Sequence, residues 1–252
     1  MNSAVTEAIE ESGFAIVPDV VDAGRIERLI ATVQDADFVR SARGEEVYGA
    51  RNILAVPQIA ALARDKTVLE LVHAIIGPDA RVVRGIFFDK TPGANWPVAW
   101  HQDLTLAVAE RRELDGWTNW SVKAGVRHVQ PPPEILERMV TLRIQLDDCG
   151  ADNGPLKVLP GTHRLGRIAA ARIAPLRREI AEHICAAPAG SALAFKPLLL
   201  HASSPAKTAR HRRVVHLEFA PRNLLPVPLD WAFGEPRSAA ARAQSAADPE
   251  QS

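Results

Sequence analysis

Residues 140–147 read VTLRIQLD, an unbroken alternation of apolar and polar side chains. Successive side chains of a β-strand point to opposite faces, so this pattern predicts a strand with one buried face. The other face would carry Thr141, Arg143 and Gln145, and the alternation leaves open whether it points to solvent or into a cavity.

Further short strands are predicted on both sides of this stretch. Residues 81–90, 156–159, 191–200 and 212–219 are rich in apolar and β-branched side chains and are bounded by Gly, Pro and Asn turns. Together with helices in the N-terminal part, they predict an α+β, mainly β fold: a barrel or sandwich with helices on one side. We expect one domain over residues 1–234, with a helical part at about 1–79 and a barrel core at about 80–221. The tail, residues 235–252, has no core residues and is predicted to be disordered.

Two amphipathic helices are expected in the N-terminal part. One follows Asp22, a suitable N-cap, and the other begins at Pro57 and ends at Gly77-Pro78. Between them, residues 35–51 are polar and contain glycine, which favours an exposed connection.

Composition excludes several classes of partner. Thirty basic and thirty acidic residues cancel, so neither a nucleic acid nor an anionic membrane is expected as a partner. No apolar run approaches the length of a membrane span, and the polar, acidic N-terminus is unlike a signal peptide, so we expect a cytoplasmic protein. The two cysteines, Cys149 and Cys185, lack CxxC spacing and are interpreted as buried apolar residues.

A candidate metal site begins in residues 96–103, WPVAWHQD. His101 and Asp103 lie two positions apart, so in an extended segment their side chains share one face. They would supply two thirds of a 2-His-1-carboxylate iron site. The best third ligand is His201, at the end of an apolar run and followed by a turn, 98 positions after Asp103.

Four short motifs then occur in a specific order. They are WHQD at residues 100–103, DNGPL at 152–156 with PGTH at 160–163, AG at 189–190 ahead of HAS at 201–203, and RRVVHL at 212–217. In this order they resemble the phytanoyl-CoA dioxygenase-like branch of the Fe(II)/2-oxoglutarate-dependent oxygenases, over roughly residues 13–221. The resemblance implies a double-stranded β-helix, that is, a jelly-roll, cupin-like barrel.

The resemblance also implies how the cofactor and cosubstrate are bound. Fe(II) would be held by His101, Asp103 and His201 as the catalytic centre, and 2-oxoglutarate and O2 would take the open metal positions. In the family an arginine eleven residues after the second metal histidine pairs with the distal carboxylate of 2-oxoglutarate; here it is Arg212.

A planar guanidinium suits this role because it binds a carboxylate through two parallel hydrogen bonds. Arg213 would point to the opposite face of the strand, so we prefer Arg212. Ser203 matches a family position that often contacts the same carboxylate.

The resemblance predicts a dioxygenase that hydroxylates a small, partly apolar molecule and releases succinate and CO2. Relatives that halogenate have a small residue in place of the carboxylate, so Asp103 indicates hydroxylation or a related oxidation. A non-catalytic, cupin-like metal-binding or sensor protein is the alternative, although it would have no need of Arg212. A zinc hydrolase is a third interpretation, but no general base is evident beside the ligands. The substrate and the oligomeric state are not predicted; no basic patch near the motif suggests a CoA thioester.

Several other residues have two interpretations. His163 and His216 are both expected to be structural, although His216 shares the strand face of Arg212 and an inward role is the alternative. Lys90 and Lys123 flank the motif and could bind an anion, although solvated surface lysines are commoner. Four tryptophans near the motif could be core residues or could line a substrate pocket: Trp96, Trp100, Trp117 and Trp120.

Overall fold

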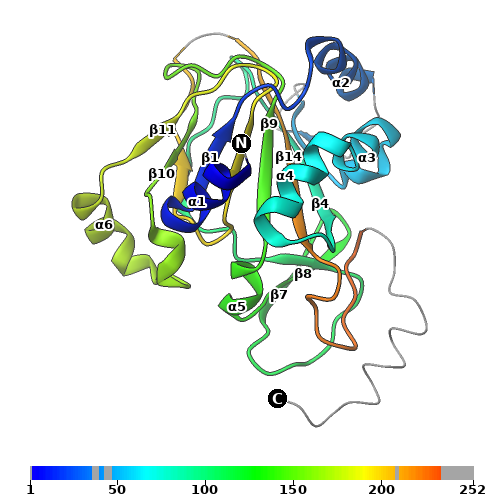
Figure 1. The fold of residues 1–252 in the computed structure, drawn as a ribbon, viewed down its shortest axis with the longest axis vertical. Helices are drawn as coiled ribbons and strands as arrows, with labels where there is room; N and C mark the ends of the chain where they lie inside the picture. Colours follow the sequence, from blue (N-terminus) through cyan, green and yellow to red (C-terminus); the bar gives the residue numbers. More distant parts are fainter. Residues whose placement is uncertain (1, 36–39, 43–46, 208–209, 234–252) are drawn as a thin grey trace.

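Two antiparallel sheets face each other in a double-stranded β-helix, and helices cover the outside of the larger sheet (Figure 1). The computed structural model describes residues 2–35, 40–42, 47–207 and 210–233. The larger sheet has seven strands in the order β1-β12-β9-β14-β4-β3-β2. Their bounds are β1 Phe14–Val17, β2 Arg40–Ala42, β3 Val47–Arg51, β4 Ala80–Lys90, β9 Val140–Gln145, β12 Ala192–Phe195 and β14 Arg212–Pro221.

The second sheet has four strands in the order β11-β10-β13-β5, and a third, small sheet has the order β6-β8-β7. The bounds of the second sheet are β5 Val98–His101, β10 Leu156–Val158, β11 His183–Cys185 and β13 His201–Ser203. Those of the small sheet are β6 Leu106–Val108, β7 Thr118–Lys123 and β8 Val126–Gln130. The small sheet lies at the lower end of the molecule in Figure 1, beside α5, Pro133–Glu137.

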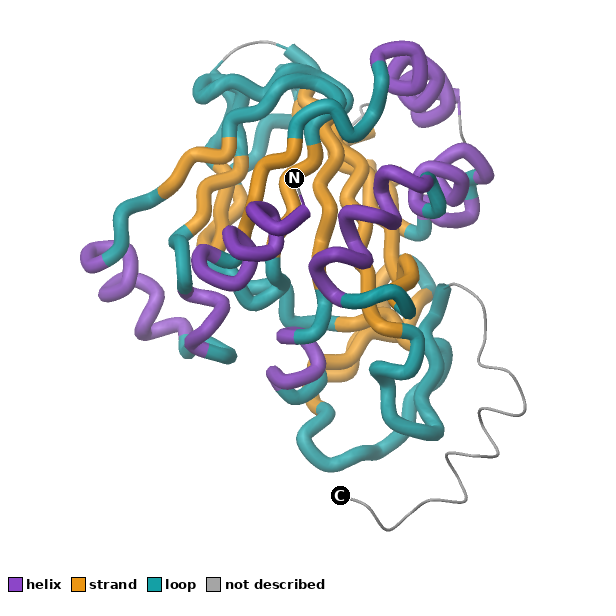
Figure 2. Tube along the Cα trace, viewed as in Figure 1, coloured by secondary structure: helices purple, strands orange, loops and turns teal. Residues whose placement is uncertain are grey.

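Four helices pack on the outer face of the seven-stranded sheet, as Figure 2 shows. They are α1 Asn2–Ser12, α2 Ala23–Asp35, α3 Pro57–Ala63 and α4 Lys66–Ile76. Ile9, Leu29 and Val72 of these helices belong to the same buried cluster as Leu142 of β9 and Leu217 of β14. A sixth helix, α6 Ala170–Glu179, lies on the other side of the molecule, and the 3-10 turns are Ile53–Ala55 and Thr162–Leu165. The predicted helices on one side of a mainly β fold are therefore confirmed.

The opposite face of the large sheet is polar but buried. Alternation places Leu142 and Ile144 of β9 in the helix-covered core, whereas Thr141, Arg143 and Gln145 point to the other side. All three are almost inaccessible to solvent, and Arg143 lines the cavity between the sheets. The orientation that the alternation left open is thus the inward one.

The predicted exposed connection at residues 35–51 is wrong where the chain is described there as strand, at β2 and β3; residues 36–39 and 43–46 lie outside the described residues. β3 pairs with β4 through Gly49–Phe88, Ala50–Phe87 and Arg51–Ile86, which extends the large sheet. Such a pairing depends on a partner distant in sequence, so local polarity does not reveal it.

Two element boundaries also differ from those expected. The helix predicted from Pro57 is two helices, because Asp65 interrupts it and caps α4 by accepting a hydrogen bond from the Thr67 amide (2.9 Å). The strand predicted up to residue 200 ends at Phe195, before a turn that contains Pro197, and His201 begins the next strand.

No helix in the described part of the chain is long and apolar enough to cross a membrane. Cys149 and Cys185 are buried and unbridged, and burial raises the pKa of the Cys185 thiol to about 12. The tail predicted to be disordered, residues 235–252, lies outside the described residues.

Candidate iron and 2-oxoglutarate site

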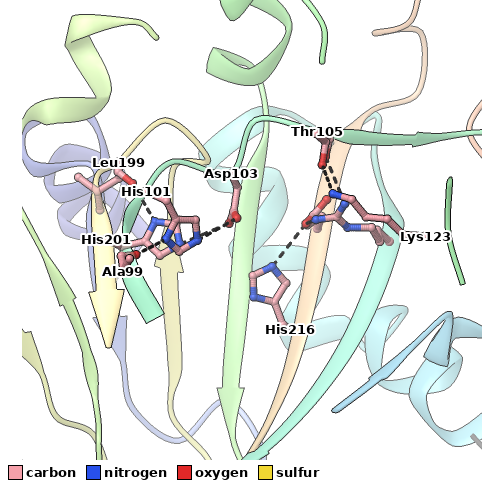
Figure 3. Close-up of polar contacts among 10 residues, drawn as sticks. Ala99, His101, Asp103, Thr105, Lys123, Leu199, His201 and His216 are labelled. Atoms are coloured by element: carbon pink, nitrogen blue, oxygen red, sulfur yellow. Dashed lines mark hydrogen bonds and ion pairs between the residues drawn. The ribbon is translucent and has the colours of Figure 1, made fainter. Parts of the chain in front are cut away.

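The two candidate histidine ligands are direct neighbours across a pair of strands. β5 ends at His101, β13 begins at His201, and these two residues are paired in the antiparallel register. Their ring centroids lie 4.2 Å apart. Asp103 follows two positions after β5 and is held by a hydrogen bond from its amide to the Pro197 carbonyl (2.9 Å). The sheet therefore brings together three side chains from two distant segments, as Figure 3 shows.

Backbone carbonyls set the tautomer of both rings. His101 Nδ1 lies 2.8 Å from the Ala99 carbonyl, and His201 Nδ1 lies 2.9 Å from the Leu199 carbonyl. A carbonyl can only accept, so each Nδ1 carries the proton and each Nε2 keeps a free lone pair. Burial lowers the pKa of His201 to about 4, which keeps that ring neutral near pH 7. Both histidines are thus prepared as metal ligands.

The free donor atoms converge on one point. His101 Nε2 lies 3.7 Å from Asp103 Oδ1, and His201 Nε2 lies 3.7 Å from Asp103 Oδ2. One ligand atom from each of the three residues can be chosen with all separations within 4.8 Å. Asp103 Oδ2 is buried and accepts no hydrogen bond from a described residue. An orphaned carboxylate oxygen beside two imidazole lone pairs fits a divalent transition metal, and three ligands leave positions for a cosubstrate.

Gln102, between the two ligands, fixes the loop that carries them. Its side chain points away from His101 and Asp103, as alternation requires. Its amide donates to the Leu198 and Gly166 carbonyls (2.6 and 2.8 Å), and its oxygen accepts from the Ile168 amide (2.8 Å).

The three ligands line a cavity of about 250 Å³ between the sheets. Its apolar walls include Phe88, Val98, Leu156 and Phe195. Two sets of cationic side chains stand around it. We call Lys90, Arg143 and Arg212 the inner cation group, and Arg51, Arg84 and Lys123 the outer cation group.

The two neighbouring arginines of β14 point in opposite directions. Arg212 is 2% exposed and lines the cavity, where one of its amino groups donates to the Gly154 carbonyl (2.6 Å) while its Nε has no described partner. Arg213 lies outside the cavity lining and forms an ion pair with Asp147 (2.6 Å). Of these two neighbouring arginines, Arg212 is therefore the one that can contact a molecule in the cavity.

The DNGP turn places the carbonyl that contacts Arg212. Gly154 has φ 61°, and a Cβ at this position would lie 2.8 Å from the Ser204 carbonyl. Only glycine fits that close approach without a shift of the backbone.

Lys90 is not the solvated lysine that is commonest at such a position. It is 1% exposed, and its ammonium donates to Ser203 Oγ (3.0 Å) and to the Ser204 carbonyl (2.7 Å). Burial, followed by the charges of Arg212 and Arg143, lowers the pKa of Lys90 to about 7. The cavity lining includes Ser203 but not Lys90, so Lys90 places a titratable charge behind the wall, one hydrogen bond away from the cavity.

Arg143 and His216 complete the inner wall. They are paired across β9 and β14, and both line the cavity. The Arg143 guanidinium stands 5.7 Å from the Phe88 ring centre, and its buried Nε has no hydrogen-bond partner among the described residues. Burial lowers the pKa of Arg143 to about 9. His216 points inward, as its shared face with Arg212 allows, and its Nε2 lies 3.4 Å from Glu218.

The other candidate residues divide between core and cavity. Trp96 lines the cavity, whereas Trp100, Trp117 and Trp120 pack in apolar clusters elsewhere. His163 lies outside the cavity and contacts the Glu10 carbonyl (3.2 Å), which fits a structural role. Two members of the outer cation group, Arg51 and Arg84, are not identified by the sequence as site residues. No local pattern shows that β3 and β4 meet at the site.

The family model described as phytanoyl-CoA dioxygenase (PhyH) matches residues 9–214 of the chain. Solved structures with a similar fold include EctD from S. alaskensis with 2-oxoglutarate and 5-hydroxyectoine. It has a TM-score of 0.71 and 18% identity, over 96% of this chain and 86% of that one.

Two further structures are similar. The epimerase SnoN in complex with Fe3+, alpha ketoglutarate and nogalamycin RO has a TM-score of 0.68 and 16% identity, over 94% and 96% of the two chains. AviO1 from Streptomyces viridochromogenes Tue57 has a TM-score of 0.63 and 23% identity, over 90% and 98%. At these identities the likeness extends to the fold. No curated protein matches the chain at a significant level.

Proposed function

We propose that this chain, which belongs to the phytanoyl-CoA dioxygenase (PhyH) family, is an Fe(II)- and 2-oxoglutarate-dependent dioxygenase that hydroxylates a small, partly apolar molecule. The family depends on Fe(II) and 2-oxoglutarate and uses O2. One observation carries the proposal: a converging His-His-Asp set and an inward, nearly unexposed arginine occupy the same cavity. A site that only stores a metal has no use for that arginine.

Different residues of the cavity would bind the metal and the cosubstrate. His101, Asp103 and His201 would hold the metal, and Arg212 with Ser203 would orient the distal carboxylate of 2-oxoglutarate. When bound, the metal supplies oxidative decarboxylation: one oxygen atom of O2 goes to succinate, the other to the substrate as a hydroxyl group, and CO2 leaves.

Asp103 and the cavity walls narrow the outcome. A carboxylate ligand at Asp103 fills the metal position that a halide would need, which favours hydroxylation. Phe88, Leu156 and Phe195 give the cavity an apolar wall against which the apolar part of a substrate can pack. Ligand cavities are commonly about 300–1,000 Å³, and this one, at about 250 Å³, suits a small substrate.

Succinate formation tests the proposal. With Fe(II), 2-oxoglutarate, ascorbate and O2, we expect the protein to form succinate, and a matching compound in a metabolite panel to increase the rate. His201→Ala should abolish succinate formation, because it removes a ligand. His183→Ala is the matched control, since it removes an exposed histidine that does not line the cavity. Binding of Fe(II) and 2-oxoglutarate without succinate under any condition would instead identify a non-catalytic metal-binding protein.

A further inference from the structure

The cavity holds more positive charge than 2-oxoglutarate requires. We propose that the outer cation group, Arg51, Arg84 and Lys123, binds an anionic group of the substrate, either a carboxylate or a phosphate. This inference rests on the proposed function, because it assigns 2-oxoglutarate to the inner group. It makes the substrate of this enzyme a small organic acid or phosphate ester.

Three distant segments build the outer group beside the metal ligands. Arg51 ends β3, Arg84 lies on β4, Lys123 ends β7, and all three line the cavity with His101 and Asp103. Thr105 joins two of them, because its carbonyl accepts from Arg84 (3.2 Å) and its hydroxyl lies 3.4 Å from the Lys123 ammonium. Figure 3 shows Lys123 and Thr105 next to Asp103 and His216. An anion held here would therefore lie close to the metal.

The outer cations repel one another and are only partly neutralised. Burial, followed by the charges of Arg84 and Arg51, lowers the pKa of Lys123. Burial and Arg84 likewise lower the pKa of Arg51. Arg84 forms an ion pair with Glu218, and the charges of Asp103 and Glu218 raise the pKa of Lys123. Glu218 can offset one charge of the three, and Asp103 is used by the metal. Bringing like charges together in a partly buried place costs free energy, and such clusters concentrate at binding sites.

The charges of the inner cation group act mainly on one another and not on the outer cation group. The cations that lower the pKa of Lys90 are Arg212 and Arg143, both inner residues. Arg143 is 6% exposed and faces the cavity without an ion pair among the described residues. The two carboxylates of 2-oxoglutarate would be engaged by the metal, Arg212 and Arg143, which leaves the outer group for a second anion. Two separate cation groups around one metal site thus fit two different anionic molecules.

Calorimetry on the holoenzyme tests this inference. The protein, saturated anaerobically with Fe(II) and 2-oxoglutarate, is titrated with hexanoate, butyl phosphate and hexanamide. We expect hexanoate or butyl phosphate to bind at least about tenfold more tightly than hexanamide, because hydrogen bonds to charged groups are stronger than neutral ones. The tighter of the two anions distinguishes a carboxylate from a phosphate substrate. Arg51→Gln and Lys123→Gln should each reduce the preference, and Arg51→Lys and Lys123→Arg should retain most of it.

Two exposed cationic residues outside the cavity provide matched controls. Arg178→Gln and Lys66→Gln remove the same charges from exposed helical positions outside the cavity and should leave the preference intact. Equal binding of hexanoate and hexanamide, binding of neither anion, or an unchanged preference in both Gln variants would overturn the inference while 2-oxoglutarate still binds. If 2-oxoglutarate itself does not bind the Fe(II)-loaded protein, the proposed function fails first, and this inference fails with it.

Discussion

The inner and outer cation groups contain the same residue types but differ in how they are built. Lys90, Arg143 and Arg212 belong to adjoining strands of one sheet, and Arg212 is paired directly with Lys90 in the register. Arg51, Arg84 and Lys123 join two strands of that sheet to the separate β7–β8 hairpin. The inner side chains are at most 6% exposed, whereas Arg51 and Lys123 are half-buried.

This difference suggests a division of labour. A buried group on a continuous sheet is rigid and suits a cosubstrate that every family member shares. A group that depends on a hairpin can change with the hairpin and suits a substrate that differs between relatives. The variants below test whether the two groups can be separated, beginning with the largest expected effect.

Arg212 and Arg213 give the strongest test of the inner group. Arg212→Met should weaken 2-oxoglutarate binding at least about thirtyfold, since loss of one partner of a buried charge pair costs about 2–5 kcal/mol. Arg213→Met should leave that binding unchanged, because Arg213 is paired with Asp147 outside the cavity. Calorimetry with Fe(II) present measures both. Equal losses in the two variants would show that the effect comes from the strand and not from a contact with the cosubstrate.

Arg143→Met should weaken 2-oxoglutarate binding less than Arg212→Met does, and it should make the ligand-free protein more stable. An unpaired buried guanidinium destabilises the protein without ligand, so we expect the variant to unfold at a higher temperature. Its 2-oxoglutarate affinity should fall about tenfold, the value of a charged hydrogen bond. Thermal unfolding and calorimetry on one preparation check the pair of results. A variant that is less stable and binds normally would show that Arg143 serves packing alone.

The titration of Lys90 should make the affinity for 2-oxoglutarate modestly dependent on pH. With its pKa lowered to about 7, Lys90 loses its charge as the pH rises through neutrality. Affinity for the dianionic 2-oxoglutarate should therefore decrease severalfold between pH 6 and 8 in the wild type, and less in Lys90→Met.

The stability of the fold should increase with pH, whereas the affinity for 2-oxoglutarate decreases. The unfolded chain keeps the Lys90 proton up to its ordinary pKa, so the free energy of unfolding should rise with pH above about 7. Lys90→Met should lack this contribution. Chemical denaturation at several pH values measures it, and identical pH profiles for the two proteins would contradict the assignment.

The sequence identifies the three candidate metal ligands, which the structure brings together, more readily than the walls of the cavity around them. His101 and Asp103 share a strand face by alternation alone, and the order of four motifs adds His201, Arg212 and Ser203. The first pair follows from local spacing, whereas His201, Arg212 and Ser203 follow from the resemblance to the family.

The walls depend on contacts between distant segments. Arg51 lies in a segment interpreted as an exposed connection, and its role follows only from the pairing of β3 with β4. Lys90 is buried because β13 brings Ser203 against it, and Arg143 faces inward because a second sheet covers that face. A charged residue on a strand gives no local sign of such burial, so the sequence alone does not distinguish a buried Lys90 or Arg143 from a solvated one.

The most direct test of the metal and cosubstrate site is the visible absorption of the anaerobic protein with Fe(II) and 2-oxoglutarate. Chelation of Fe(II) by the 2-oxo acid produces a weak charge-transfer band, and we expect this band in the wild type and in Arg213→Met. It should be absent in His101→Ala and should require far more 2-oxoglutarate in Arg212→Met. No band in the wild type with both components present would contradict the assignment of His101, Asp103, His201 and Arg212 to one iron and 2-oxoglutarate site.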